Sequence, residues 1–222
     1  MQRDDVRDRG PGELAGPGRG LLRASALSGR QRYRLLTSLI VPRPIGWIST
    51  WGADGVRNLA PFSYFNALSA APMLVGASVG LRRGAVKDTL ANVRASGQFA
   101  VNLVTERHLE AMVHTAGDWP AGSDEFEEAG LEAADCEAVE APYVADAIAV
   151  LECRLFREIE LGAAPNTLII GEVEAVRLGR ELAVDPETLH VDPGSLRPVG
   201  RLGLDAYTTL GTVRHVPRPR VG

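Results

Sequence analysis

The chain has 222 residues, of which 45% are apolar, and its formal net charge at pH 7 is −4. This length and composition suit one large globular domain with a sizeable core, and they exclude a disordered chain or a coiled coil. The mild negative charge, spread without a block of like sign, argues against nucleic acid and an anionic membrane surface as partners.

A charged stretch precedes the first predicted element. Residues 1–28 are rich in Gly, Pro and charged side chains and contain no apolar h-region, which predicts a flexible tail and not a secretory signal. No apolar run reaches the roughly 18 residues that a membrane span needs. The two cysteines, Cys136 and Cys153, are too few and too far apart for a disulfide framework. We therefore expect a cytoplasmic protein with reduced thiols.

Short apolar runs broken by turn signals begin at Tyr33. Residues 45–51 and 56–65 flank a turn at 52–55 and predict a β-hairpin. Residues 73–79 predict a third strand that is buried on both faces.

Helices interrupt the strands in the middle of the chain. Residues 88–96 predict a short helix that ends at Gly97. Residues 99–104 predict a strand, and residues 106–115 predict a second helix. The acidic, turn-rich stretch 117–145 predicts a surface excursion with one helical turn.

Two long strands are predicted over 148–161 and 167–178, where apolar and polar residues alternate around a turn at 165–166. Strands outnumber helices, and no regular crossover helices separate them. This favours a mainly β fold, an antiparallel barrel with helical insertions, over a doubly wound parallel sheet. The barrel domain is expected over residues 29–212, and residues 213–222 are expected to form a second tail.

Three stretches concentrate polar side chains where strand packing does not require them. The first is Lys87-Asp88-Thr89, at the start of a predicted helix, where unpaired backbone N–H groups and the positive end of the helix dipole attract a phosphate. Lys87 adds a positive charge and Thr89 adds a hydroxyl donor. Asp88 could equally be the N-cap, which would give the triplet a purely structural role.

The other two stretches lie on the predicted hairpin. Ser49 and Thr50 suit either a ligand contact or ordinary strand polarity. Pro61 removes a ladder donor and predicts an edge strand or a bulge. Such a distortion would free backbone groups near Asn58 and Ser63 for a ligand, but protection of a strand edge explains Pro61 equally well.

Several other chemistries lack their sequence signatures. The four histidines show no metal-binding spacing, so no metal site is expected. The nucleophile pattern GxSxG is absent. GxGxxG in a βαβ context is also absent, which argues against a Rossmann nicotinamide domain.

Five segments, taken in order, resemble the flavin reductase-like, FMN-binding split-barrel family. They are VPRPIGWIST (41–50), NLAPFSYFNALSAAP (58–72), KDTLANVRASGQFAVNLV (87–104), AVLECRLFREIELGAAPNTLIIGEV (149–173) and RPVGRLG (197–203). The resemblance covers residues 33–207. It implies a six-stranded Greek-key split barrel that binds FMN near the interface of a homodimer.

Matching the family's motifs to this sequence assigns cofactor contacts. Those with the flavin phosphate or ribityl chain would come from Ser49, Thr50, Lys87 and Thr89. Those along the isoalloxazine ring would come from Asn58, Ala60, Phe62 and Ser63. Asn92 is a further candidate, and Arg201 and Tyr207 would approach the cofactor or the partner subunit.

Two positions depart from the resemblance. Gly46 and Trp47 stand where Ala and a small aliphatic residue are usual in the family, so the pocket wall there is expected to differ. Trp47 is itself a cofactor-site candidate. Its ring could stack on the flavin, line a substrate pocket or point into the barrel as core.

The resemblance implies an FMN-dependent oxidoreductase of the NAD(P)H:flavin reductase type, in which NADH or NADPH passes a hydride to FMN. The flavin ring carries such chemistry, so no catalytic side chain is assigned. The reduced flavin would serve a partner flavin-dependent monooxygenase or a small-molecule substrate. Two alternatives stay open: a non-enzymatic flavin carrier or electron relay, and an FMN enzyme specialised for one small organic substrate in a biosynthetic pathway.

Overall fold

The structure is a computed structural model, and it describes residues 20–219 except residues 83, 121 and 163–165. Most of the predicted N-terminal tail, the first residue of the predicted turn at 165–166 and the last three residues of the predicted C-terminal tail lie outside the described residues. The domain limits at 29 and 212 therefore stay predictions. No helix within the described ranges is long and apolar enough to cross a membrane.

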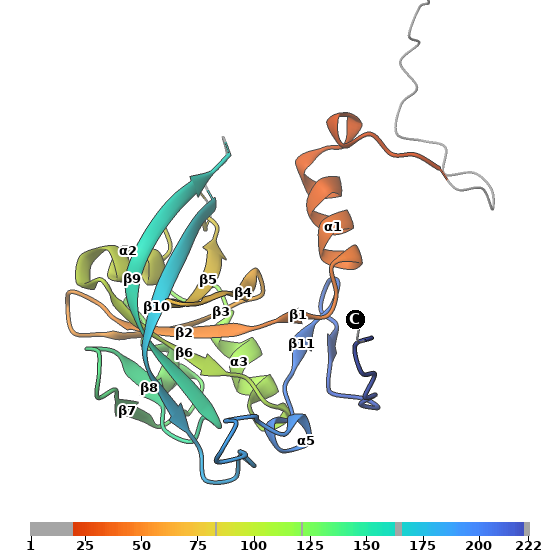
Figure 1. The fold of residues 1–222 in the computed structure, drawn as a ribbon. Coiled ribbons are helices and arrows are strands. Elements are labelled where there is room, and N and C mark those ends of the chain that lie inside the picture. Colours follow the sequence, from red (N-terminus) through yellow and green to blue (C-terminus); the bar gives the residue numbers. More distant parts are fainter. Residues whose placement is uncertain (1–19, 83, 121, 163–165, 220–222) are drawn as a thin grey trace, which may run out of the picture.

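Strands dominate the fold (Figure 1). They are β1 (Arg43–Pro44), β2 (Gly46–Trp51), β3 (Arg57–Phe62), β4 (Phe65–Ala70), β5 (Met73–Val79), β6 (Gln98–Leu103), β7 (Ala133–Asp135), β8 (Pro142–Val144), β9 (Ala149–Leu161), β10 (Asn166–Leu178), β11 (Gly200–Arg201) and β12 (Tyr207–Thr208). The α-helices are α1 (Gly29–Leu39), α2 (Asp88–Ser96), α3 (Leu109–Thr115), α4 (Glu125–Glu128) and α5 (Pro193–Leu196). Two 3-10 turns, η1 (Ala24–Ala26) and η2 (Glu106–His108), complete the elements.

Seven strands form one antiparallel sheet in the order β3-β2-β6-β9-β10-β5-β4. Its two edge strands, β3 and β4, follow each other in the chain, separated only by Ser63 and Tyr64. The sheet must therefore curl until its edges meet, and the Ser78 N–H donates to the Tyr64 carbonyl at 2.8 Å beside this corner. The predicted mainly β barrel is confirmed.

The predicted strand at 56–65 ends earlier, at Phe62, and a strand that was not predicted, β4, begins at Phe65, so the main sheet has seven strands and not six. The chain turns at Ser63-Tyr64 so that Phe65 pairs with Ala77 of β5. Pro61 lies on β3, where it pairs with Trp47 of β2, and the other side of β3 is the edge of the sheet. The missing N–H of Pro61 thus costs no ladder hydrogen bond.

Alternation along β2 sends its side chains to two separate cores. Ile48 joins the barrel interior, which α2 closes from one side with Leu90 and Val93. Trp47 joins a second core on the other face of the sheet, with Met112 of α3. The two faces of β2 and β3 therefore contact different cores. Since neighbouring residues of a strand point to opposite faces, only polar residues at alternate positions can share a site.

Several parts of the fold were not predicted, the sheet β7-β8 and helix α1 among them. The excursion at 117–145 holds the expected helical turn, α4, and also the two-stranded sheet β7-β8. Helix α1 begins at a capping box in which Ser28 and Gln31 bond to each other's backbone N–H groups. In Figure 1, α1 stands apart from the barrel. Only Thr37 of this helix is buried.

A buried arginine ties α1 to the rest of the chain. The Arg43 guanidinium donates to the carbonyls of Thr37 and Ile40 at the end of α1, at 2.6 and 2.9 Å. It also donates to the Leu202 carbonyl at 2.9 Å. Arg43 lies on β1, which forms a small sheet with β11 and β12. Its cation therefore caps the negative end of the helix and fixes α1 to the C-terminal segment.

Candidate functional site

A cleft of about 830 Å³ opens between β3, the start of α2 and the loop after α3. This volume is typical of small-molecule and cofactor sites. Its lining residues are Asn58, Ala60, Pro61, Leu81, Arg82, Ala85, Val86, Lys87, Asp88, Thr89, Thr115, Ala116, Gly117, Asp118, Trp119, Pro120 and Glu125.

The start of α2 offers the cleft unsatisfied donors. Lys87 is the N-cap residue, so the predicted alternative of an Asp88 N-cap is wrong, and no side chain in the described part of the chain caps the helix. Among the described residues, no acceptor takes the backbone N–H groups of Asp88 and Thr89. A helix end that exposes such groups is suited to bind an anion.

Lys87 adds a positive charge at the same point. It is the only lysine in a chain that otherwise uses arginine. Its Nζ lies 5.1 Å from the centre of the Phe62 ring. Burial lowers the pKa of the Lys87 ammonium, and the nearby Arg82 charge lowers it further. A bound anion would offset both effects.

Four of the predicted residues form one hydrogen-bonded cluster behind these donors. Thr50 and Asn58 face each other across β2 and β3. The Thr89 hydroxyl donates to the Asn58 side-chain oxygen at 2.6 Å, and the Asn92 amide donates to the Thr50 hydroxyl at 2.9 Å. The cluster fixes α2 against the hairpin, so it holds the donors of α2 in place.

Two predicted residues lie elsewhere. Trp47 and Ser49 have no exposed surface and point away from Thr50. The Trp47 indole donates to the Thr115 hydroxyl at 2.9 Å. The Ser49 hydroxyl donates to the Pro142 carbonyl at 2.6 Å. The two side chains are therefore buried and are not among the residues that line the cleft, and their contact with a cofactor stays a prediction.

The remaining predicted residues divide between the cleft and the core. Ala60 lines the cleft. Phe62 is 5% exposed and belongs to the barrel core beneath Lys87. Ser63 lies at the corner after β3, where the Arg43 Nε donates to its hydroxyl at 3.4 Å.

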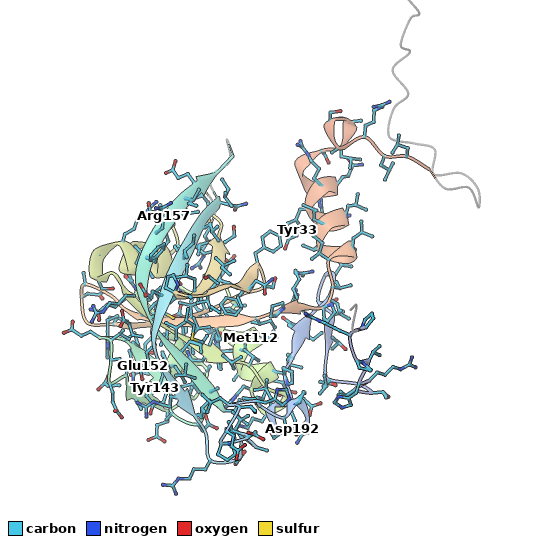
Figure 2. All side chains as sticks on the ribbon, viewed as in Figure 1. Tyr33, Met112, Tyr143, Glu152, Arg157 and Asp192 are labelled. Carbon is cyan, nitrogen blue, oxygen red and sulfur yellow. The ribbon has the colours of Figure 1, made fainter. Side chains whose placement is uncertain are left out.

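A second cavity, of about 470 Å³, adjoins the cleft. Pro61 and Ala116 line both spaces. The other lining residues are Tyr33, Arg34, Thr37, Ser38, Arg43, Ile45, Ser63, Met112, Arg201, Leu204 and Tyr207. Figure 2 shows Tyr33 on the side of α1 that faces the barrel.

A family model described as the flavin reductase like domain matches residues 38–199. The chain belongs to the flavin reductase-like family. This span contains both faces of the hairpin, α2 and the whole cleft.

Several solved structures have a fold similar to that of this chain. Nitrilotriacetate monooxygenase component B from Bacillus cereus is 31% identical, with a TM-score of 0.85 over 90% of this chain and 100% of that one. The 2-nitrobenzoate 2-nitroreductase NbaA of Pseudomonas fluorescens is 31% identical, with a TM-score of 0.82 over 90% and 96%. A Shewanella frigidimarina protein described as a flavin reductase with a split barrel domain is 25% identical, with a TM-score of 0.77 over 88% and 96%.

Of the cleft residues that were not predicted from the sequence, one is both charged and buried. Glu125 lies in the acidic excursion, yet it is 6% exposed. Both oxygens of its carboxylate accept from the Asn58 amide nitrogen, at 3.1 Å each, and one of them also accepts from the Leu59 N–H at 2.9 Å. The available signal was Asp124, which caps the single turn of α4 and thereby directs the next residue inward.

The Glu125→Gln variant should gain stability over wild type as pH rises. Burial raises the pKa of Glu125, although the bonds from Leu59 and Asn58 oppose this effect. The folded state therefore holds the proton more tightly than the unfolded chain, whose Glu pKa is about 4.3. Wild type loses stability between that value and the raised pKa, and the variant does not. Urea unfolding from about pH 4 to 8 measures the difference.

Glu127→Gln is the matched control, because Glu127 lies on the same helical turn with its side chain 76% exposed. A stability difference between Glu125→Gln and wild type that is constant with pH would contradict the prediction.

Proposed function

We propose that this chain is an FMN-dependent oxidoreductase of the NAD(P)H:flavin reductase type, which passes a hydride from NADH or NADPH to FMN. The proposal rests above all on one observation. The cleft presents the half-buried Lys87 ammonium together with two backbone N–H groups at the start of α2 that have no acceptor among the described residues. This donor set fits a phosphate, and the cleft volume fits a cofactor.

The residues have separate tasks in this proposal. Lys87 and the N–H groups of Asp88 and Thr89 would hold the phosphate. Asn58, fixed by Thr89 and Glu125, would orient polar groups of the cofactor, and Ala60 would leave room beside β3. When bound, the flavin would supply the redox chemistry, which these side chains cannot perform.

The use of the electrons is also proposed. A relative named as a monooxygenase component supports a partner flavin-dependent monooxygenase. A relative named as a nitroreductase supports reduction of a small organic substrate in place. The second cavity beside the cleft favours the latter as an alternative. The homodimer stays a prediction, supported by exposed apolar residues of α1 and its C-cap, among them Tyr33, Leu36, Leu39 and Ile40.

The Lys87→Gln variant should bind FMN about ten- to a hundredfold more weakly, the usual value of a charge-assisted hydrogen bond. Its affinity for riboflavin, which lacks the phosphate, should stay unchanged. Fluorescence titration with each flavin measures both affinities. Lys87→Arg keeps the charge and should lose much less. Equal losses for both flavins would contradict the phosphate role.

The single lysine gives an independent readout. An amine-selective acylating reagent can modify only one side chain, Lys87, besides the N-terminus. FMN should protect Lys87 from the reagent, and riboflavin should protect it less. Anaerobic mixing with NADH and NADPH then tests the reaction itself. Bound FMN that neither nicotinamide bleaches would leave the flavin carrier as the function.

A further inference from the structure

The second cavity is positively charged. Three arginines line it, Arg34, Arg43 and Arg201, and no Asp or Glu is among its described lining residues. None of the three has an ion-pair partner among the described residues, so their combined field favours an anion in the cavity and disfavours a cation. The cavity also has hydroxyl donors on several sides, including that of Tyr33.

Arg43 supplies charge to the cavity but has few free donors. Its guanidinium is committed to three carbonyl oxygens and to the Ser63 hydroxyl. Arg43 is also 6% exposed, so it could not move toward a ligand without releasing α1.

Arg201 is different, because only part of its donor set is used. It donates to the Tyr207 hydroxyl and the Leu204 carbonyl, both neutral acceptors. Its guanidinium lies 4.3 Å from the centre of the Tyr207 ring. No described carboxylate lies within ion-pair distance of Arg201. Since a guanidinium has five N–H donors, several remain for a ligand.

The surroundings of Arg201 disfavour its positive charge as long as no anion is bound beside it. Burial lowers the pKa of Arg201, as does the neighbouring Arg43, whereas Tyr33 and the exposed Asp205 raise it. The backbone register of β1, β11 and β12 sets Arg43, Arg201 and Tyr207 in one cross-strand row. A partly buried arginine held beside a second arginine is a strong site for an anion.

The second cavity also lies next to the proposed flavin cleft, where a compound that exchanges electrons with the flavin would bind. Pro61 and Ala116 separate it from the proposed flavin cleft, and both line the two spaces. Ile45 and Met112 give its floor an apolar surface. A molecule with an anionic end at Arg201 and an apolar body would extend toward the flavin.

We propose that the second cavity binds the compound that exchanges electrons with the flavin, and that Arg201 holds the carboxylate or phosphate of that compound. The proposal rests on the proposed function for the identity of the neighbouring cleft. Arg201 is then a specificity-determining residue, which selects organic anions over neutral compounds of the same shape.

The test titrates FMN-loaded protein with benzoate and, separately, with ADP by calorimetry. Benzoate probes a small carboxylate substrate, and ADP probes the phosphates of a nicotinamide dinucleotide. We expect at least one of them to bind, with an affinity that falls as salt is added. Benzamide, neutral and of similar shape to benzoate, should bind much more weakly.

Arg201→Gln should weaken anion binding about ten- to a hundredfold. Arg201→Lys should recover part of the affinity, which a merely structural role for Arg201 does not predict. The matched control is Arg157→Gln, which removes a charge from an exposed position on β9 (Figure 2). That control should leave anion binding unchanged.

The FMN affinity of every variant is measured first. A failure of the proposed function can then be told apart from a failure of the proposed anion site. Wild-type protein that takes up no FMN would refute the proposed function, and its anion binding would then be measured without flavin. Failure of wild type to bind either anion, or equal binding by wild type and Arg201→Gln, would overturn the Arg201 site.

Discussion

The Trp47→Ala variant is expected to lose about 3–5 kcal/mol of its free energy of unfolding, as large-to-small aromatic substitutions do in a core. Trp47 is fully buried and packs in the core that also holds Met112 and Phe126. Its removal leaves a cavity and ends the bond from the indole to Thr115. Urea unfolding of the flavin-free protein measures the loss.

FMN affinity should survive the Trp47→Ala change, because the Trp47 side chain lies on the opposite face of β2 from Thr50 and is not among the residues that line the cleft. Trp47→Phe, which keeps most of the volume, should lose less stability. The Thr115 hydroxyl would still donate to the Met112 carbonyl at 2.8 Å. A Trp47→Ala protein as stable as wild type but poor in FMN binding would restore the stacking role that the sequence left open.

Local patterns predicted most of the barrel. The strand at 73–79 and the helix at 88–96 match β5 and α2 in their bounds. Gly97 ends α2 with a φ of 68°, the left-handed conformation that favours glycine. The corner at Ser63-Tyr64 carries no Gly or Pro, and it exists because the sheet edges must meet there. Short-range rules do not contain that constraint.

Helix α1 was missed for a different reason. A local signal for its start was present in the sequence, but the composition of the preceding stretch outweighed it. The Ser28-to-Gln31 spacing is typical of a capping box. The charged, Gly-rich stretch before it favoured a tail, and the helix has almost no buried face to give an amphipathic pattern. Arg43 holds α1 in place through hydrogen bonds. Such a tertiary contact does not produce a periodic pattern of apolar residues, so it cannot be recognised in the sequence.

The sequence identified the polar residues that cluster beside the cleft, but it did not identify which side chains of β2 point toward them. Strand parity alone separates Trp47 and Ser49 from Thr50. Which face carries the cleft depends on where α2 and α3 pack, so parity could not assign it. The departure at Gly46 has a local cause: a Cβ there would lie 2.7 Å from the Phe65 ring, so glycine makes room for the barrel corner.

Arg43→Met should destabilise the protein by about 3–5 kcal/mol, because three carbonyl oxygens lose a charged donor and each buried polar group left unpaired costs about 1–3 kcal/mol. The change strips three carbonyls of their donor and removes the cation at the end of α1. An 11-residue helix is marginal in water by itself. We therefore expect α1 to open, and hydrogen exchange across Gly29–Leu39 should rise far more than exchange in α2.

Two further variants separate the role of Arg43 from a general effect of lost charge. Arg32→Gln removes an exposed cation from α1 itself and should change neither stability nor exchange. Arg43→Lys keeps the charge but cannot reach three carbonyls in a fixed fork, so its loss should be intermediate. Unchanged exchange of α1 in Arg43→Met would show that another surface, such as a second copy of the chain, holds the helix. Because α1 and Arg43 both line the second cavity, opening of α1 should also abolish anion binding there, while the more distant Lys87 keeps its affinity for FMN.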